Sequence, residues 1–533
     1  MRKRPNIIIF NPDEMRWDTM SHMNNPAAIT PNLDEIIKND AVSFSHAFCQ
    51  NPVCVPSRCS FMTGLYPHTR GHRTMSYLLH PGEDSILKEL KEGGYYVWMN
   101  DRNDLTAGQI DGWTESHADE IFYNSKKVRR GQAVKDYHNN PKYKFSHFEG
   151  ELKLDSDGLQ YNSDDEVVDA AIERMLNPKD DKPLCMFMGL FYPHVPYQVE
   201  EPYFSAIDRK KLLKRIKLEE CSGKAPILEK IKSYCAMDDL SEEEWDEIRA
   251  TYLGMCMKID NQFGRLVNAL KKAGIYDDTA IFFFSDHGDF AGDYSLVEKS
   301  QNSFEDCLTR VPFLIKPPKG YEIDPGVNDN LVELIDFYAT AMDMAQVKPN
   351  HTNFGRSLVK NIANKKEKAR EYVFSEGGRE AGEIHCDEFH ADPNPNTPYW
   401  PKKMAQSFDE LHDKGIMIRN NEFKYISRSR TKDELYDLIN DPKETTNIID
   451  NQEYKDVVSK MQYELMKWLQ RTADIVPFEY DARFTKAMTW SKLQGMVKPQ
   501  DEEKVKAFIN TGAPFGACIG YVIRLNNGEK DEN

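Results

Sequence analysis

Runs of apolar residues recur along the first part of the chain, separated by segments with helical spacing. The runs are Asn6–Phe10, Tyr95–Met99, Leu184–Phe191, Ala280–Ser285 and Pro312–Ile315. Strands that are apolar along their whole length are typical of a parallel sheet covered on both faces by helices. The pattern therefore predicts an α/β domain, which we place at residues 1–370.

The clearest predicted helix starts near Ser241. Ser241 and Glu244 have the spacing of a capping box, in which each residue binds the backbone of the other. An apolar stripe with helical period then continues from Trp245 to Leu270, and Gly274 follows its end. A helix of this length is expected to cover one face of the sheet.

The pattern changes after about residue 370. Three short strands and an amphipathic helix are predicted there: Glu371–Ser375, Gly415–Arg419, Glu422–Ser427 and Tyr454–Arg471. Between them, Cys386–Lys402 is rich in Pro, Asn and Asp and is predicted to be a long loop. We expect a small α+β domain over residues 371–473 and a C-terminal extension over residues 474–533, whose role the sequence does not give.

Charge and composition limit the function classes. The chain has 86 acidic and 69 basic residues, a net charge of −17, which is the wrong sign for binding nucleic acid or an anionic membrane surface. We find no apolar stretch long enough for a membrane span or a secretory signal, and the ten cysteines lack zinc-type or disulfide-type spacing. We therefore expect a cytoplasmic protein without nucleic-acid or membrane partners. The oligomeric state stays open, a homo-oligomer included.

Polar residues follow four of the predicted strands, at the edge where open parallel sheets bind their ligands. In chain order they are Asp13-Glu14, Arg102-Asn103-Asp104, His194 and Asp286-His287. One such coincidence would mean little, but four of them predict a single site.

The most specific motif is Cys54-Val55-Pro56-Ser57-Arg58-Cys59-Ser60-Phe61-Met62-Thr63-Gly64. A helix that starts near Ser57 would place residue 54 close to a positive helix end, which favours an anion. Arg58 would face the same point and bind an oxyanion. For an arbitrary cysteine, an unmodified core residue would be the better interpretation. The whole motif, however, resembles the sulfatase signature, in which Cys or Ser is followed by x-Pro-Ser-Arg and later by a hydrophobic residue, Thr and Gly.

This resemblance, which covers roughly residues 5–470, implies a fold and a nucleophile. The fold would be alkaline-phosphatase-like, with a large sheet between helices and a smaller C-terminal domain. Cys54 would be converted to formylglycine by a separate maturation enzyme. One hydroxyl of the hydrated aldehyde would attack sulfur, and the other would later expel the sulfate. Glu434–Leu438 resembles the family's C-terminal signature and would serve packing between domains.

Asp13, Glu14, Asp286 and His287 resemble the metal cluster of the alkaline-phosphatase superfamily. A hard divalent cation takes carboxylate oxygens and neutralises charge on a tetrahedral anion. Many sulfatases have Asp and Asn where this chain has Glu14 and His287. A nitrogen ligand weakens the preference for calcium, so we expect one Ca²⁺, with Mn²⁺ as the alternative.

The resemblance also implies residues that bind and protonate the sulfate ester. His194 lies in a Pro-His-x-Pro segment, whose histidine contacts sulfate and protonates the leaving alkoxide. Lys299, which follows Asp286 at the shorter of the family's spacings, would contact sulfate. Arg102 and Asp104 stand where the family has lysine and histidine. Arg102 can still bind an oxyanion, and Asp104 would orient Arg102 or a substrate hydroxyl.

Four residues outside these motifs are predicted to line the substrate pocket: His72, Arg73, Arg379 and His385. Arg379 and His385, with His390, lie in an insertion that could contact a substrate carboxylate; a solvated loop is the alternative interpretation.

The sequence therefore predicts a hydrolase for sulfate esters of a small sulfated substrate, preferably a carbohydrate such as a uronate-containing glycosaminoglycan fragment. Two alternatives stay open. One is a phosphonate monoester or phosphodiester hydrolase on the same scaffold, and the other is a catalytically silent sulfatase-like binding protein.

Overall fold

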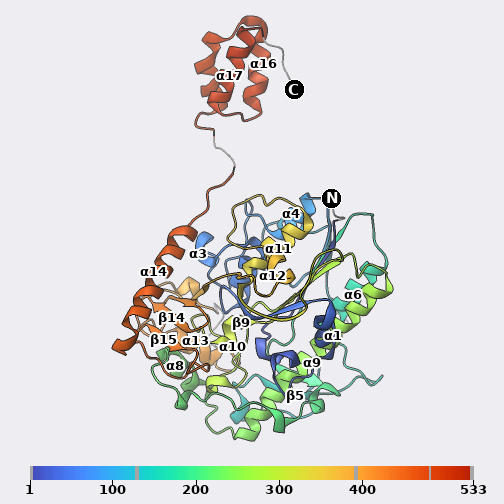
Figure 1. Ribbon diagram of the computed structural model, residues 1–533, viewed down its shortest axis with the longest axis vertical. Coiled ribbons are helices and arrows are strands. Elements are labelled where there is room, and N and C mark those ends of the chain that lie inside the picture. The colour runs from blue at the N-terminus through green and yellow to red at the C-terminus, as the bar shows by residue number, and fades with distance from the viewer. Residues whose placement is uncertain (1–3, 126–130, 138, 389–393, 479–481, 529–533) are drawn as a thin grey trace. The chain divides into compact units, whose positions relative to one another are not determined.

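The structure of the protein is a computed structural model, which describes residues 4–125, 131–137, 139–388, 394–478 and 482–528. The chain forms two compact units (Figure 1). The larger consists of Met1–Pro349 and Asn353–Asp474, and the smaller of Asn350–Thr352 and Ile475–Asn533. All of the predicted site residues belong to the larger unit.

A mixed, mostly parallel sheet runs through the larger unit. Within the described residues it has nine strands in the order β11-β2-β10-β8-β1-β6-β3-β4, with β9 paired to β2. The strands are β1 (Asn6–Asn11), β2 (Val42–Phe48), β3 (Tyr96–Asn100), β4 (Glu120–Phe122), β6 (Leu184–Gly189), β8 (Thr279–Phe284), β9 (Arg310–Val311), β10 (Phe313–Lys316) and β11 (Gly326–Glu333). β1 is parallel to β6 and β8, which flank it. The predicted α/β class is confirmed, but the Pro312 strand, β10, runs antiparallel to both of its neighbours.

The side chains of β1 alternate between two hydrophobic cores. Ile8 and Phe10 lie in one core, Ile7 and Ile9 lie in the other, and all four are fully buried. Burying each such side chain contributes about 1.5–3 kcal/mol. The first core is covered by α1 (Pro31–Asn39), α6 (Ser163–Leu176) and α9 (Glu242–Lys272). The second is covered by α2 (Cys54–Thr63), α4 (Ile86–Glu92) and α11 (Ile335–Ala345).

The longest helix, α9, starts where the capping box predicts. Ser241 Oγ accepts a hydrogen bond from Glu244 N at 3.3 Å, and Glu244 Oε2 accepts one from Ser241 N at 2.7 Å. Helix α2, in contrast, already begins at Cys54, three residues before the predicted start at Ser57. Pro56 is tolerated there because the first turn of a helix has no intrahelical use for its N–H.

A four-stranded antiparallel sheet forms the C-terminal part of the larger unit, in the order β12-β13-β14-β15. Its elements are β12 (Val373–Gly377), β13 (Gly415–Arg419), β14 (Phe423–Arg428), β15 (Glu434–Asp437) and the adjacent helix α14 (Lys455–Thr472). Lys424 fixes it to the rest of the unit, because its Nζ donates to Phe304 O at 2.8 Å and to Asp306 Oδ1 at 2.7 Å. The segment predicted as a long loop is partly helical, since α13 (Trp400–Gln406) begins inside it.

The remaining elements are short or belong to the smaller unit. In the larger unit, β5 (Phe148–Leu152) and β7 (Tyr197–Glu200) form a two-stranded parallel sheet. Its other helices are α3 (Pro67–Arg70), α5 (Trp113–Ser116), α7 (Tyr203–Ala206), α8 (Pro226–Cys235), α10 (Asp306–Thr309) and α12 (Val359–Ala363). The smaller unit contains α15 (Lys486–Leu493), α16 (Glu502–Asn510) and α17 (Phe515–Asn526), which share a core of Leu493, Val505, Ile509, Cys518 and Val522. Among the described helices, none has the length and apolar content needed to cross a membrane.

Candidate active site

Four buried side chains converge at the carboxyl ends of β1 and β8. They are Asp13, Cys54, Asp286 and His287, and each offers one ligand atom within 4.8 Å of the others. The parallel register of β1 and β8 brings the loops that follow both strands to the same edge of the sheet. The predicted convergence of positions 13, 54, 286 and 287 is therefore present in the fold.

Cys54 is the first residue of α2, and its thiol lies inside this cluster. Its Sγ is 3.1 Å from His287 Nε2 and 3.5 Å from Asp13 Oδ1. Burial and the neighbouring Asp13 raise the pKa of the Cys54 thiol well above its ordinary value. The unmodified side chain therefore stays a protonated thiol, which is a weak nucleophile.

Arg58, one turn further along α2, joins the two carboxylates of the cluster. Its Nε donates to Asp286 Oδ2 at 2.9 Å, and its Nη2 donates to Asp13 Oδ2 at 3.1 Å. Its Nη1 is buried and has no hydrogen-bond partner among the described residues. One donor of a fixed, buried guanidinium thus remains for a substrate oxyanion.

Arg102 reaches the same carboxylate from the end of β3. Its Nη2 donates to Asp13 Oδ2, its Nη1 donates to Leu190 O at 2.9 Å, and its guanidinium lies over the Phe191 ring at 5.2 Å. Although burial alone would raise it, the positive charges of Arg102 and Arg58 hold the pKa of Asp13 well below its ordinary value. Asp13 is therefore an anion under all ordinary conditions.

Asp104 and Gly189 shape the surroundings of these arginines. Asp104 Oδ2 lies 3.8 Å from Arg58 Nε and 3.9 Å from Arg102 Nη2, a position that agrees with orienting Arg102. Gly189, at the end of β6, allows the Arg102 backbone to come close: a Cβ atom at this position would lie 2.3 Å from Arg102 O. A larger residue there would displace Arg102.

Lys299 and His194 form the other side of the site, together with Glu14. Lys299 Nζ lies 3.1 Å from Glu14 Oε2 and 3.0 Å from His194 Nε2. His194 Nδ1 lies 2.8 Å from Val195 O, so Nδ1 carries the proton and Nε2 accepts from Lys299. Burial and Lys299 lower the pKa of His194 well below its ordinary value, and its imidazole is neutral here.

Glu14 is placed beside the main cluster rather than in it. It forms a second group of converging ligand atoms with Asp13 and His194. Its Oε1 is buried and has no hydrogen-bond partner among the described residues. Two adjoining groups that share Asp13 thus contain all four residues predicted to bind metal.

The family follows from comparison with known proteins. Residues 5–347 match the family model described as Sulfatase, which is more than half of the chain. The chain belongs to the sulfatase family. It is therefore a sulfuric ester hydrolase with a fold of the alkaline-phosphatase superfamily.

Relatives of this sulfatase match along most of its length. It is 25% identical over 493 residues to an arylsulfatase of Clostridium perfringens, covering 88% of this chain and 95% of the relative. It is 23% identical to an N-acetylglucosamine-6-O-sulfatase of Bacteroides thetaiotaomicron, covering 88% and 86%. The solved structure of a phosphonate monoester hydrolase of Agrobacterium radiobacter has a TM-score of 0.69 at 20% identity, covering 91% of this chain and 99% of that one. The last likeness shows the shared fold.

Several residues near the sulfatase site carry no sequence signal. Lys299 also pairs with Glu298 at 2.7 Å, and Glu298 pairs with Lys402 of α13. Lys402 in turn lies 3.3 Å from Glu388 Oε1. This buried chain of alternating charges positions Lys299, but it depends on tertiary contacts that composition and spacing do not reveal.

The residues predicted to line the substrate pocket bind other protein groups. His72 Nε2 lies 3.0 Å from Glu83, and Arg73 Nη2 lies 3.1 Å from Glu383. The Arg379 guanidinium is 1% exposed and binds Asp387 and Asp409. His385 is exposed, and His390 lies outside the described residues. Because Arg379 is buried and already paired, it is not available to a substrate carboxylate.

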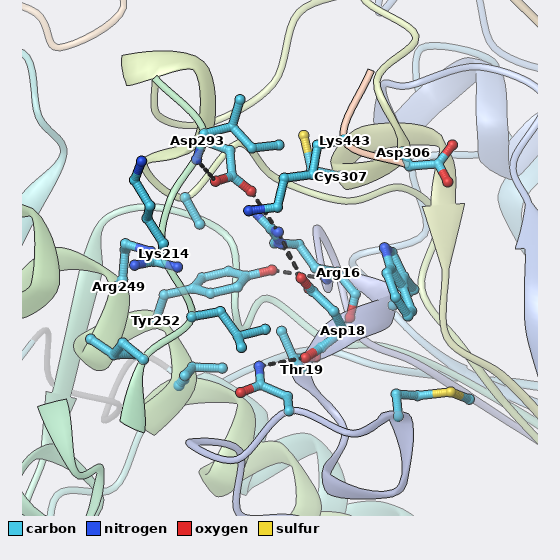
Figure 2. Close-up of a pocket in the computed structure, with 18 of the residues that line it drawn as sticks. Arg16, Asp18, Thr19, Lys214, Arg249, Tyr252, Asp293, Asp306, Cys307 and Lys443 are labelled. Carbon is cyan, nitrogen blue, oxygen red and sulfur yellow. Dashed lines mark hydrogen bonds and ion pairs between the residues drawn. The ribbon is translucent and has the colours of Figure 1, made fainter. Parts of the chain in front are cut away.

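A cavity of about 300 Å³ near Tyr252 contains none of the predicted site residues (Figure 2). Arg16 binds Asp18 at 2.7 Å and Asp293 at 2.8 Å. The described lining has four basic and four acidic side chains: Arg16, Lys214, Arg249 and Lys443, and Asp18, Asp293, Asp306 and Glu444. The described lining of this cavity therefore has no excess of positive charge with which to hold a sulfate.

Tyr252, in the wall of that cavity, holds the backbone of Glu14. Its hydroxyl donates to Glu14 O at 2.6 Å and accepts from Arg16 N at 2.9 Å. Glu14 has a φ of 69°, in the left-handed region, so its conformation needs such support.

We expect Tyr252→Phe to lower stability by about 1–2 kcal/mol and kcat/KM by about tenfold, measured by chemical unfolding and sulfate release. Tyr161→Phe removes an exposed hydroxyl bound to Asp169 and is the control. Equal activity of both variants would contradict the role of Tyr252.

Proposed function

We propose that this sulfatase hydrolyses a sulfate ester of a carbohydrate, with a formylglycine nucleophile made from Cys54. One observation carries the proposal. The Cys54 thiol lies within 3.5 Å of Asp13 and His287, in a buried cluster that also holds Arg58. The signature around Cys54 and the position of its thiol therefore support the same nucleophile.

Conversion of Cys54 is needed because the thiol itself stays protonated in this environment. A separate maturation enzyme would oxidise the side chain, so that sulfur is lost and an aldehyde oxygen takes its place. Addition of water then gives a geminal diol. One diol oxygen attacks sulfur with release of the alkoxide, and loss of the second hydroxyl proton returns the aldehyde and frees sulfate.

The side chains at this edge of the sheet fit a divalent cation. Asp13, Asp286 and His287 offer converging donors, Glu14 lies beside them, and the buried Oε1 of Glu14 lacks a partner. Such a cation, when bound, neutralises charge on the sulfate and on the attacking oxygen. The carboxylate oxygens favour calcium as the bound metal. The nitrogen ligand of His287 also suits manganese, which is the alternative.

The remaining polar groups are arranged to hold the sulfuryl oxygens and to move a proton. Arg58 Nη1, Arg102 and Lys299 surround the cluster with fixed positive charge, which stabilises a transition state more than it would in water. His194 Nε2 carries no proton of its own and accepts a hydrogen bond from Lys299, so the proton for the leaving alkoxide would come from the Lys299 ammonium by way of His194 Nε2.

The choice of a carbohydrate rests on named relatives. Besides the Bacteroides N-acetylglucosamine-6-O-sulfatase, a relative 24% identical over 474 residues is an ulvan-active sulfatase of Formosa agariphila. A solved structure with a TM-score of 0.67 is a complex with D-glucosamine-2-N,6-O-disulfate. A uronate substrate has less support, because Arg379, expected to bind its carboxylate, binds Asp387 and Asp409 instead.

Rates on matched aryl substrates test the reaction class. We expect kcat/KM for 4-nitrophenyl sulfate to exceed that for 4-nitrophenyl phenylphosphonate and bis(4-nitrophenyl) phosphate by at least about a hundredfold, or about 2.7 kcal/mol. A second candidate is a phosphonate monoester or phosphodiester hydrolase. Two observations support it: a histidine follows Asp286, and a phosphonate monoester hydrolase shares the fold. A preference for either phosphorus substrate would establish that candidate in place of sulfate hydrolysis.

A further inference from the structure

A cavity of about 750 Å³ adjoins the catalytic cluster. His194 and Phe191 belong to its wall, and His194 Nε2 is 3.0 Å from Lys299 Nζ. Arg102, which binds Asp13, lies over the Phe191 ring. A sulfate bound by Lys299 and Arg102 would therefore leave the rest of its ester in this cavity, which we name the leaving-group cavity.

The wall of the leaving-group cavity is aromatic and polar, with little net charge. Its aromatic and amide side chains are Tyr143, Phe148, Phe191, Tyr192, Tyr399, Gln160, Asn162 and Gln198. Apart from two histidines, the described lining has one basic side chain, Lys144, and one acidic side chain, Glu149. Their opposite charges sum to zero. Such a wall suits a ring with apolar faces and hydroxyl groups. Arginine, the residue that binds a carboxylate with two parallel hydrogen bonds, is absent from its described lining.

His147 gives this wall a polar group that the protein leaves unused. No described residue forms a hydrogen bond with its imidazole, and its ring meets that of Tyr399 edge-on at 4.9 Å. Its backbone is in the left-handed region, with a φ of 54°. A non-glycine residue there costs about 1–3 kcal/mol, and such strain tends to cluster at functional sites. Tyr197 N helps to hold the conformation by donating to His147 O at 2.7 Å.

The charge state of His147 agrees with an uncharged partner. Burial and the nearby Lys402 and Lys299 lower the pKa of the His147 imidazole to about 3. At neutral pH the ring therefore has one donor and one acceptor nitrogen, as a sugar hydroxyl also has one donor and one acceptor function. A carboxylate would gain no charge pairing from this residue.

We infer that the leaving-group cavity binds an uncharged sugar ring, with the Tyr399 ring against one sugar face and His147 bonded to a sugar hydroxyl. The inference rests on the proposed function and narrows it: the sulfated residue of the substrate is a neutral or N-acetylated sugar rather than a uronate. His147 and Tyr399 then determine specificity.

Matched sugar sulfates test the choice of substrate. The monosulfates of glucose and glucuronate at O2 and at O3 differ only in the carboxylate, and N-acetylglucosamine 6-sulfate and 4-nitrophenyl sulfate complete the set. With the matured enzyme, we expect kcat/KM for at least one neutral sugar sulfate to exceed that for every glucuronate sulfate tenfold or more. A glucuronate sulfate as the best sugar substrate would overturn the inference.

Two variants test the residues. Tyr399→Leu removes the ring, and His147→Asn keeps a residue type that tolerates a positive φ. Each should lower kcat/KM for the neutral sugar sulfate at least tenfold more than for 4-nitrophenyl sulfate, while thermal unfolding shows that both remain folded. In the unreactive Cys54→Ala background, calorimetry should show the same loss as a tenfold rise in Kd for the sugar sulfate. Tyr463→Leu, at an exposed tyrosine of α14, is the control.

The outcomes separate this inference from the proposed function. Equal losses on sugar and aryl sulfates in Tyr399→Leu and His147→Asn, or no loss at all, would overturn the roles of these residues and leave sulfate hydrolysis intact. Activity on 4-nitrophenyl sulfate without activity on any sugar sulfate would overturn the inference and the carbohydrate part of the proposed function, and would leave sulfate hydrolysis by Cys54 intact. If the matured enzyme releases sulfate from none of the probes, the proposed function fails, and the inference fails with it.

Discussion

Cys54→Ala is expected to abolish sulfate release, with kcat/KM falling by about 10⁴–10⁶-fold, because alanine can form neither a formylglycine nor another nucleophile. The fold should persist, because among the described residues the thiol makes two weak polar contacts, to His287 and Asp13, and alanine is a good helix former. Sulfate release by ion chromatography measures the activity, and thermal unfolding measures the fold. Mass spectrometry of the tryptic peptide that contains position 54 should show the aldehyde in the wild-type enzyme.

Cys185→Ala provides the matched control. Cys185 is fully buried in β6, outside the signature around Cys54, and burial raises the pKa of its thiol in the same direction. Its replacement should lower stability by about 1–2 kcal/mol and leave kcat/KM within a few-fold of wild type. Full turnover by protein with an unmodified Cys54, or retained activity in Cys54→Ala, would show that another group is the nucleophile.

The central strands could be predicted because their burial determines their composition. β1 lies between two parallel strands and two helical layers, so each of Ile7, Ile8, Ile9 and Phe10 must be apolar. β2 shows the limit of this reasoning. It contains Ser43 and Ser45, so its apolar run is interrupted although it lies inside the sheet.

Strand direction was a second limit. The sequence of β10 has the same short apolar run in either orientation, so its antiparallel pairing with β8 and β2 appears only in the structure. The three helices of the smaller unit were also missed. Each helix is short, segments with Pro and Gly separate the three, and the common core of Leu493, Val505 and Cys518 appears only in three dimensions.

Some residues of the site could be predicted from the sequence and others could not, for similar physical reasons. Asp13, His194, Asp286 and His287 stand directly after buried strands, and parallel strands end at one edge of a sheet, so their convergence follows from topology. The positions of residues in the wall of the leaving-group cavity do not follow from the strand order. His147 and Tyr399 belong to segments far apart in sequence and meet only because β5 and α13 approach the same cavity. The convergence of the cluster could thus be predicted from the sequence, whereas the wall of the leaving-group cavity could not.

Arg58→Ala is expected to lower kcat/KM by about 10³-fold and to make stability strongly dependent on metal. The variant removes a buried donor to the oxyanion, which accounts for about 10²–10³-fold, and it loosens Asp13 and Asp286. In metal-free protein it also leaves two buried carboxylates without their shared guanidinium, so the free energy of unfolding should fall by about 3–5 kcal/mol. Urea unfolding with excess Ca²⁺ and with a chelator measures the effect.

The direction of the metal effect is the decisive part of this prediction. Arg58 and a divalent cation both neutralise Asp13 and Asp286, and they repel each other, so removing Arg58 should increase the stabilisation that Ca²⁺ provides. Arg428→Ala removes a comparably buried arginine that binds Glu434 at 2.6 Å and Asp413 at 3.4 Å, away from the cluster. Its destabilisation should be the same with and without Ca²⁺. If Ca²⁺ stabilises Arg58→Ala no more than wild type, the cation does not bind between these carboxylates, and the assignment of Asp13 and Asp286 as its ligands is wrong.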